Sequence, residues 1–393
     1  MRQASESKPF RRSGVLLRQP ARQLARVGLL VLVALLCGPA PAQALPLFAH
    51  QYGVTCEKCH SVIPHLNAFG AAFLAFGYRI PGVQPGPAFP LSGKVNLVDS
   101  SENQGAGPNG AGLPKAIVDE VELFTAGALG TRASYLIEQY AVDGGEPGLT
   151  RDAWIIDRIN PWQARIPVSA QIGSFTLPLP VDPETFRDSY QNYTIYTQTV
   201  GDDTSNFFDP KIGAQLSVGD QLRGLNVKVF AGPGHDRQSG LSSTGTDFMG
   251  TVQDALGPFT LSLYDYQGTR PVPATSGPDR FTRTGYAFVY DQWGRFSSET
   301  VLQTGWDSRC GVAGFTGCAS SGGFTQLRYA FNKRLYVLGR YEGTNDPSNG
   351  FTRDGVLLVG WGPSERSRVT LEDVIQHVPQ TMNTMNLQFS VAY

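Results

Sequence analysis

From Ser92 onward the chain consists of segments of about ten residues in which apolar and polar positions alternate. The last segment is the clearest, with Leu387, Phe389, Val391 and Tyr393 separated by polar or small residues. A period of two predicts β-strands with one apolar and one polar face. Strands of about 9–11 residues are long enough to cross a bilayer when tilted.

The connections between these segments alternate between short and long. Short turns are expected near Gly130, Asn160–Arg165, Gly219–Asp220, Leu256–Pro258, Trp293–Gly294, Asn332–Lys333 and Pro363–Arg366. Longer loops are expected near 100–115, 143–150, 176–209, 233–245, 269–279, 307–322, 344–353 and 377–382. A soluble β-sandwich does not show so regular an alternation, whereas outer-membrane barrels have short periplasmic turns and long outer loops. The prediction is a mainly β fold, an outer-membrane antiparallel β-barrel of about 16 strands over residues 92–393.

Three parts of the predicted barrel stand out. Residues 176–209 do not fit the alternation, and the sequence leaves two extra strand pieces, a plug or a folded-in loop as their structure. Cys310 and Cys318 fall within one Gly-rich loop, where an exported protein is expected to form a disulfide. Acidic residues of the first strands are expected to fill the polar lumen. They are Asp99, Asp119, Glu120, Glu122 and Glu138.

Composition agrees with a barrel and excludes other classes. Only 17% of the residues are charged, below the roughly 25% of soluble domains, and glycine occurs 45 times. With 32 basic and 33 acidic residues the chain has no positive excess for binding nucleic acid. No apolar run of about 18 residues follows residue 44, which excludes a helical membrane protein.

Residues 1–44 have the features of a cleaved export signal. A basic stretch with seven Lys or Arg residues precedes the apolar run Val27–Cys37, and Ala42-Gln43-Ala44 is a small-x-small cleavage site. Without this leader the net charge becomes −7. Cys37 leaves with it, so four cysteines remain in an oxidising compartment.

The motif Cys56-Glu57-Lys58-Cys59-His60 is C-x-x-C-H, the attachment signature of c-type haem. Its spacing lets two thiols bind the two vinyl groups of one haem while His60 serves as the proximal axial ligand of the iron. A zinc site requires a second ligand pair nearby, which the sequence lacks. We therefore expect one covalent haem c within residues 45–91, a unit too small to form a core of its own.

The other axial ligand is left open by the sequence. His65 and His50 are the local candidates, a distant methionine is a third, and a five-coordinate iron is a fourth. His65–Tyr78 is expected to form a short helix. Its apolar face, with Phe69 and Phe73 at helical spacing, is expected to cover the porphyrin.

These motifs resemble the fused monohaem cytochrome c–porin family of the bacterial outer membrane, whose best-known members are iron(II) oxidases. The resemblance rests on Phe48-Ala49 before the haem motif, Pro64-x-Leu66-x-x-Phe69-Gly70-x-x-Phe73 and Gly77-Tyr78, about 35 residues in all. It implies a haem segment on the periplasmic side of the barrel or inside it. It also implies an iron(II):cytochrome oxidoreductase that takes electrons from extracellular Fe(II).

The physical expectation is electron transfer across the outer membrane. A lipid core about 30 Å thick blocks electrons, and a haem in the lumen shortens the gap. The expected partners are a periplasmic c-type cytochrome or other electron carrier, an outer donor such as Fe(II), and outer-membrane lipid. Two alternatives remain: a solute-conducting porin with a haem plug or redox gate, and a haem-based sensor or peroxidase-like protein.

Overall fold

The computed structural model describes residues 46–62, 65–86, 91–101, 116–162, 164–183, 186–201, 206–235, 242–270, 279–291, 295–310, 317–347, 349–378 and 380–392. The predicted export signal, the turn Trp293–Gly294 and the C-terminal Tyr393 lie outside this part of the chain. Within it, no helix is long and apolar enough to cross a membrane.

The N-terminal segment, residues 46–86, contains five short elements. They are α2 (Pro46–Tyr52), the 3-10 helix η1 (Cys56–Lys58), β1 (His60–Val62), β2 (His65–Leu66) and α3 (Ala68–Ala75). The predicted helix His65–Tyr78 is wrong at its start, because His65 and Leu66 pair with β1 as a strand. Asn67 caps the helix instead, since its side chain accepts a hydrogen bond from the Gly70 N–H at 3.0 Å.

Residues 92–392 form a closed antiparallel barrel in which β19 pairs with β3. Its strands are β3 (Ser92–Ser100), β4 (Ala116–Leu129), β5 (Ala133–Asp143), β6 (Glu146–Pro147), β7 (Thr150–Arg158), β8 (Val168–Phe175), β9 (Lys211–Gly219), β10 (Gly224–His235), β11 (Ser242–Leu256), β12 (Phe259–Arg270), β13 (Asp279–Asp291), β14 (Phe296–Asp307), β15 (Cys318–Ala330), β16 (Leu335–Asp346), β17 (Gly350–Ser364), β18 (Ser367–Val378) and β19 (Gln380–Ala392). Because β5 also pairs directly with β7, the two-residue β6 is an accessory, and 16 long strands form the wall. The predicted mainly β barrel of about 16 strands is confirmed.

Alternation gives the wall two different faces. On β14, Leu302 and Trp306 are exposed on the outer face, whereas Gln303 and Asp307 are buried on the inner face. The same inversion of the usual order, apolar out and polar in, recurs around the barrel. Because the barrel is closed, every strand has a neighbour on both sides and no backbone edge is left unpaired. The wall presents an apolar exterior, as membrane barrels do.

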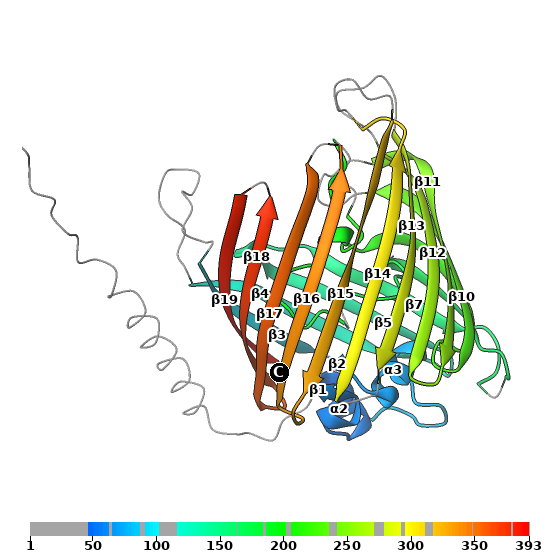
Figure 1. Ribbon diagram of the computed structural model, residues 1–393. Coiled ribbons are helices and arrows are strands. Elements are labelled where there is room, and N and C mark those ends of the chain that lie inside the picture. The colour runs from blue at the N-terminus through cyan, green and yellow to red at the C-terminus, as the bar shows by residue number, and fades with distance from the viewer. Residues whose placement is uncertain are drawn as a thin grey trace, which may run out of the picture. The chain divides into compact units, whose positions relative to one another are not determined.

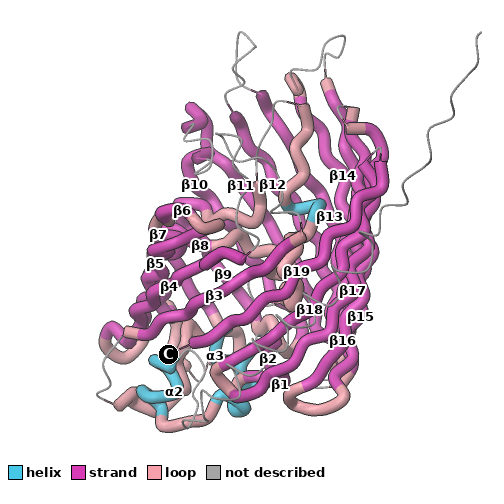
Figure 2. Tube along the Cα trace, turned by 90° about the vertical axis from the view of Figure 1, so that its left-hand side faces the viewer, coloured by secondary structure: helices cyan, strands magenta, loops and turns pink. Residues whose placement is uncertain are grey.

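The strand ends that the described short turns join lie together at one end of the wall (Figures 1 and 2). The N-terminal segment is at the short-turn end, which is the lower end in Figure 1, together with the end of β19 (Figures 1 and 2). Two predicted long loops, 344–353 and 377–382, are wrong: Asp346 pairs with Gly350 and Val378 with Gln380 in tight turns. Their polar residues extend the hairpins, as Thr344 and Thr352 show by bonding across the strands at 2.7 Å.

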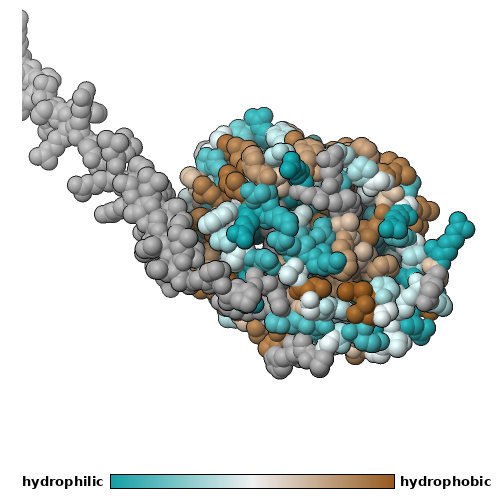
Figure 3. Space-filling model, turned by 90° about the horizontal axis from the view of Figure 1, so that it is seen from below, coloured by the Kyte–Doolittle hydropathy of each residue, from teal (hydrophilic) through white to brown (hydrophobic). Residues whose placement is uncertain are grey.

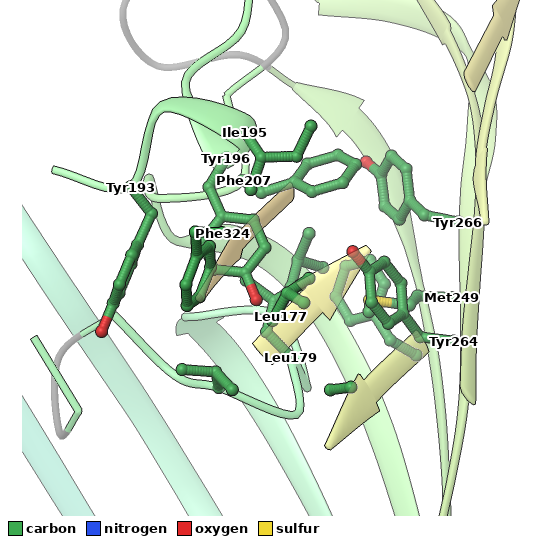
Figure 4. Close-up of a cluster of buried hydrophobic side chains, with 14 of the residues drawn as sticks. Leu177, Leu179, Tyr193, Ile195, Tyr196, Phe207, Met249, Tyr264, Tyr266 and Phe324 are labelled. Atoms are coloured by element: carbon green, nitrogen blue, oxygen red, sulfur yellow. The ribbon is translucent and has the colours of Figure 1, made fainter. Parts of the chain in front are cut away.

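Residues 176–209 are a folded-in loop, one of the three structures that the sequence left open. Among their described residues the regular element is the 3-10 helix η3 (Thr194–Tyr196). Apolar side chains of this lumen segment pack against inward-facing rings of the wall (Figure 4). Tyr193 stacks on Phe324 with centroids 4.2 Å apart, and Phe207 contacts Tyr266 at 5.0 Å. The barrel therefore has an apolar core inside its lumen.

Cys310 and Cys318 form a disulfide bond beside the end of this segment. Val200 is buried against both cysteines. Gly201 has a φ of +63°, and a Cβ there would lie 1.8 Å from the Cys310 carbonyl oxygen. The outer loop and the lumen segment are thus in direct contact.

Candidate functional site

The C-x-x-C-H motif forms a compact turn at the short-turn end of the barrel. Cys56 and Cys59 are the first residue and the C-cap of η1, and the Cys59 N–H donates to the Cys56 carbonyl at 3.0 Å. Both thiols are free. Burial raises the pKa of Cys56 to about 12, helped by the neighbouring carboxylate of Glu365, and burial raises the pKa of Cys59 to about 11. The thiols therefore stay protonated at neutral pH.

Contacts with the short turns hold this motif on the barrel. The Cys56 N–H donates to a carboxylate oxygen of Glu365, in the turn between β17 and β18, at 3.3 Å. Glu57 forms an exposed ion pair with Lys333, in the turn between β15 and β16. The C-x-x-C-H motif is thus attached to the wall at residues far away in the sequence.

Helix α3 packs closely on the motif because residue 70 is glycine. A Cβ at Gly70 would lie 2.0 Å from the Cys59 carbonyl oxygen. That carbonyl accepts a hydrogen bond from the Asn67 N–H at 2.8 Å, and the Asn67 side chain also donates to the Glu57 carbonyl at 3.2 Å. The start of α3 and the motif therefore form one unit.

Aromatic rings of the N-terminal segment form a cluster beside Cys59. Phe48 stacks on Tyr78 at 4.4 Å and meets Phe73 edge-on at 5.3 Å, while Phe69 and Phe73 lie parallel at 6.4 Å. Tyr78 also stacks on Trp154 of β7 at 5.9 Å. The cluster thus joins the segment to the inner face of the wall.

A cavity of about 970 Å³ lies between this cluster and the wall. Cys59 and His60 line it, as do the predicted packing residues Phe69 and Phe73. Its base, at the aromatic cluster, is apolar, and apart from residues such as Phe124, Leu136 and Trp154 the wall side chains that line it are mostly polar. The polar lining includes Lys94, Asn96, Asp119, Glu120, Glu122, Glu138, Arg151, Arg187, Tyr190, Arg366 and Arg368. Seen from the short-turn end, apolar and hydrophilic patches lie side by side (Figure 3).

The candidates for the second axial position do not line this cavity. His65 is buried, with Nε2 2.8 Å from an oxygen of Asp291 on β13, and its ring meets Phe186 edge-on at 5.8 Å. Its neighbour Leu66 lines the cavity, as alternation along β2 requires. His50 is exposed. Of the methionines, Met249 lies in the lumen core, and Met382 and Met385 are exposed.

Four of the five acidic residues expected in the lumen line the cavity: Asp119, Glu120, Glu122 and Glu138. Lys94 crosses to this group, with Nζ 2.6 Å from Glu122 and 3.7 Å from Glu120. Asp99 is not part of the lining. Within the described ranges, no three His, Cys, Asp or Glu side chains are grouped as a metal site.

Sequence reasoning missed the cationic residues of the cavity, above all Arg151 and Arg187. Arg151 belongs to β7 and Arg187 to the lumen segment, and neither lies in a motif. Phe208, near the end of the same segment, contacts both of them, because both guanidinium groups lie over its ring. Only the folding of residues 176–209 into the lumen brings the three side chains together.

Comparisons with known proteins identify the fold. No family model matches the chain, and no curated protein matches it. Among solved structures it is similar to the anion-selective porin from Comamonas acidovorans, at 12% identity and a TM-score of 0.55, over 77% of this chain and 98% of that one. It is also similar to Salmonella typhi OmpF in complex with daunomycin, at 12% identity and a TM-score of 0.57, over 77% and 97%. A loop-deletion mutant of the Vibrio cholerae outer-membrane protein OmpT gives 10% identity and a TM-score of 0.51, over 77% and 98%. The chain has the porin fold.

Proposed function

We propose that this chain is an electron-transfer protein of the bacterial outer membrane, with one covalent haem c held in the cavity at the short-turn end of its barrel. The observation that supports this most is the position of the C-x-x-C-H motif, because Cys59 and His60 line a cavity between an aromatic cluster and a polar lumen. The porin fold and the apolar exterior support the outer-membrane location. By analogy with such barrels, the short-turn end faces the periplasm.

The cavity fits a haem in size, and Cys59 and His60 line it, whereas Cys56 lies outside this lining and borders a small second pocket that His60 also lines. The 970 Å³ of the larger cavity is at the upper end of the range of about 300–1,000 Å³ for ligand and cofactor sites. Cys56 and Cys59 would form the two thioether bonds, His60 would be the proximal ligand, and Phe69 and Phe73 would pack on the porphyrin. When bound, the haem supplies a one-electron iron couple whose potential depends on ligation, burial and hydrogen bonding.

The proposed direction of flow is from an outer donor such as extracellular Fe(II) to a periplasmic c-type cytochrome or other carrier. Contacts at the short turns hold the haem segment where a periplasmic protein can approach it. Electron transfer requires only approach and a matched potential, so no substrate pocket is needed. As an oxidoreductase the chain would act between the Fe(II) donor and the cytochrome.

The first test is covalent haem attachment in the full chain, expressed with a cytochrome c maturation system. We expect a haem-stained band at the mass of the barrel after denaturation, and its loss in Cys56→Ala/Cys59→Ala. The matched control is Cys310→Ala/Cys318→Ala, which removes the other cysteine pair and keeps the stain. Unstained wild-type protein in the outer-membrane fraction would overturn the haem assignment.

The second test concerns transport of electrons. In oriented outer-membrane vesicles, a membrane-impermeant donor on the outside should reduce the haem. If reduction occurs only with reductants on the periplasmic side, the chain is not a conduit. Electron flow in the opposite direction would use the same haem and barrel. In that case a periplasmic donor reduces the haem and an acceptor on the outside oxidises it.

A second candidate function is a haem-based sensor or peroxidase-like protein. The lining of the cavity favours it. Among the described residues of that lining, His60 is the only histidine and there is no methionine, so no second side-chain ligand of either type faces the cavity. Rapid carbon monoxide binding to the reduced protein would support an open sixth position. A porin with a haem plug or redox gate predicts instead that solute conductance changes with the redox state of the haem.

A further inference from the structure

Two arginines of the cavity share one aromatic ring. The guanidinium carbons of Arg151 and Arg187 lie 4.4 and 4.9 Å from the centroid of Phe208. Both distances are within the range of a cation–π contact. All three residues line the cavity, and we call them the arginine clamp.

Local contacts hold the clamp in place. Arg151 donates from Nη2 to the Phe208 carbonyl at 3.3 Å, and its side chain is only 12% exposed. Arg187 donates from Nη1 to the Tyr190 carbonyl at 3.4 Å. The Asp152 carboxylate lies 3.9 Å from the Arg151 Nε, and the charges of Asp119 and Glu120 act on Arg187. The planar guanidinium group carries its N–H groups at its edge, where they can donate in plane to a carboxylate.

The other cations of the cavity have different roles. Lys94 is paired with Glu122, and Arg368 donates to Gln388 at 3.0 Å and to the Asp188 carbonyl at 3.2 Å. Arg366 lies in the turn that binds the C-x-x-C-H motif, where its charge acts on Cys56. Because much of the remaining charged lining is acidic, the clamp is the part of the cavity best suited to an anion.

A haem attached through its vinyl groups has a fixed polarity. The thioether edge lies at the cysteines, and the two propionate carboxylates lie on the opposite edge of the porphyrin. With the first edge at the apolar base of the cavity, the second is directed toward its polar part. We propose that Arg151 and Arg187, held by Phe208, bind the haem propionates, an inference that rests on the proposed function.

The test is a redox titration of the haem-loaded full chain at several pH values between 5 and 8. In Arg187→Gln and in Arg151→Gln the midpoint potential falls, because removal of a positive charge stabilises the ferric state. The propionates also lose the charge that keeps them ionised, so their pKa rises. The potential of each variant then depends more steeply on pH than that of the wild type, because the other carboxylates of the cavity are the same in both.

Matched variants separate charge from structure. Arg132→Gln removes the same charge from the exposed turn between β4 and β5, outside the cavity, and should leave the potential unchanged. Arg187→Lys keeps the charge and should show a smaller fall than Arg187→Gln. If Arg187→Gln does not fold, the midpoint potential of Arg187→Lys is measured instead. Phe208→Leu removes the shared ring and should lower the potential less than either Arg→Gln change.

Each other outcome overturns the proposal. Haem-loaded glutamine variants with the wild-type potential and the wild-type pH dependence would show that the clamp does not touch the propionates. A free-anion site would appear as a changed chloride-to-potassium permeability ratio in reconstituted Arg187→Gln with an unchanged potential. Wild-type protein without covalent haem would overturn the proposed function and the clamp together, whereas the first two results leave the haem assignment intact.

Discussion

At the scale of single residues, Gly70 determines how closely the helix can approach the haem motif. A β-carbon at this position would meet the Cys59 carbonyl oxygen at 2.0 Å, and that atom belongs to the backbone. The backbone cannot rotate away as a flexible side chain can. We therefore expect Gly70→Ala to push α3 away from the motif and to cost about 1–3 kcal/mol, as overpacking does.

The readout for Gly70→Ala is the ratio of haem to protein in purified outer-membrane fractions, which should fall. Gly355→Ala is the matched control, because a Cβ there has no atom within 4 Å and the residue does not need a positive φ. Equal haem content in the two variants would contradict the close packing of α3 on Cys59.

At the scale of elements, the lumen segment is held by charged groups of the wall. Arg340 of β16 donates to Glu342 at 2.9 Å, to the Ser189 hydroxyl at 2.6 Å and to the Gln191 carbonyl at 2.8 Å. Glu342 in turn accepts from the Thr194 N–H at 2.8 Å. Arg340→Met leaves the buried Glu342 without its cation, which should lower the free energy of unfolding by about 3–5 kcal/mol.

Denaturant unfolding of refolded protein measures this loss, and limited proteolysis of residues 189–194 locates it. Arg353→Met provides the control, since Arg353 is exposed on the neighbouring strand β17. Its unfolding free energy should change by no more than about 0.5 kcal/mol. If both variants are equally stable and equally resistant to protease, Arg340 does not anchor the segment.

The elements differ in how far the sequence predicted them. Strands and most turns follow from alternation and from local residues such as Asn332 and Gly130, so these predictions succeed. The hairpin ends near 344–353 and 377–382 are rich in polar residues, and this polarity resembles that of loops. The lumen segment depends on packing against Phe324 and Tyr266, which no local pattern encodes.

The same division applies to the candidate site. The haem motif and its aromatic neighbours Phe69 and Phe73 are contiguous in sequence, so their association was predictable. The placement of His65 against Asp291 was not, because the two residues are 226 positions apart and meet only when the barrel closes. The arginine clamp was missed for the same reason.

At the scale of the whole molecule, the apolar exterior requires a bilayer around the barrel, and the depth of each residue in it can be tested. Leu302, in the middle of β14, is 59% exposed, and Leu256, at the short-turn end of β11, is 55% exposed. An arginine on the lipid face costs about 2–4 kcal/mol at the midplane and about 0–1 kcal/mol near the interface. Leu302→Arg should therefore destabilise the barrel in lipid vesicles much more than Leu256→Arg. Both side chains are similarly exposed, so solvent exposure alone predicts equal effects. Equal unfolding free energies of the two variants in vesicles would contradict a membrane-spanning wall and, with it, a conduit that connects two sides of a membrane.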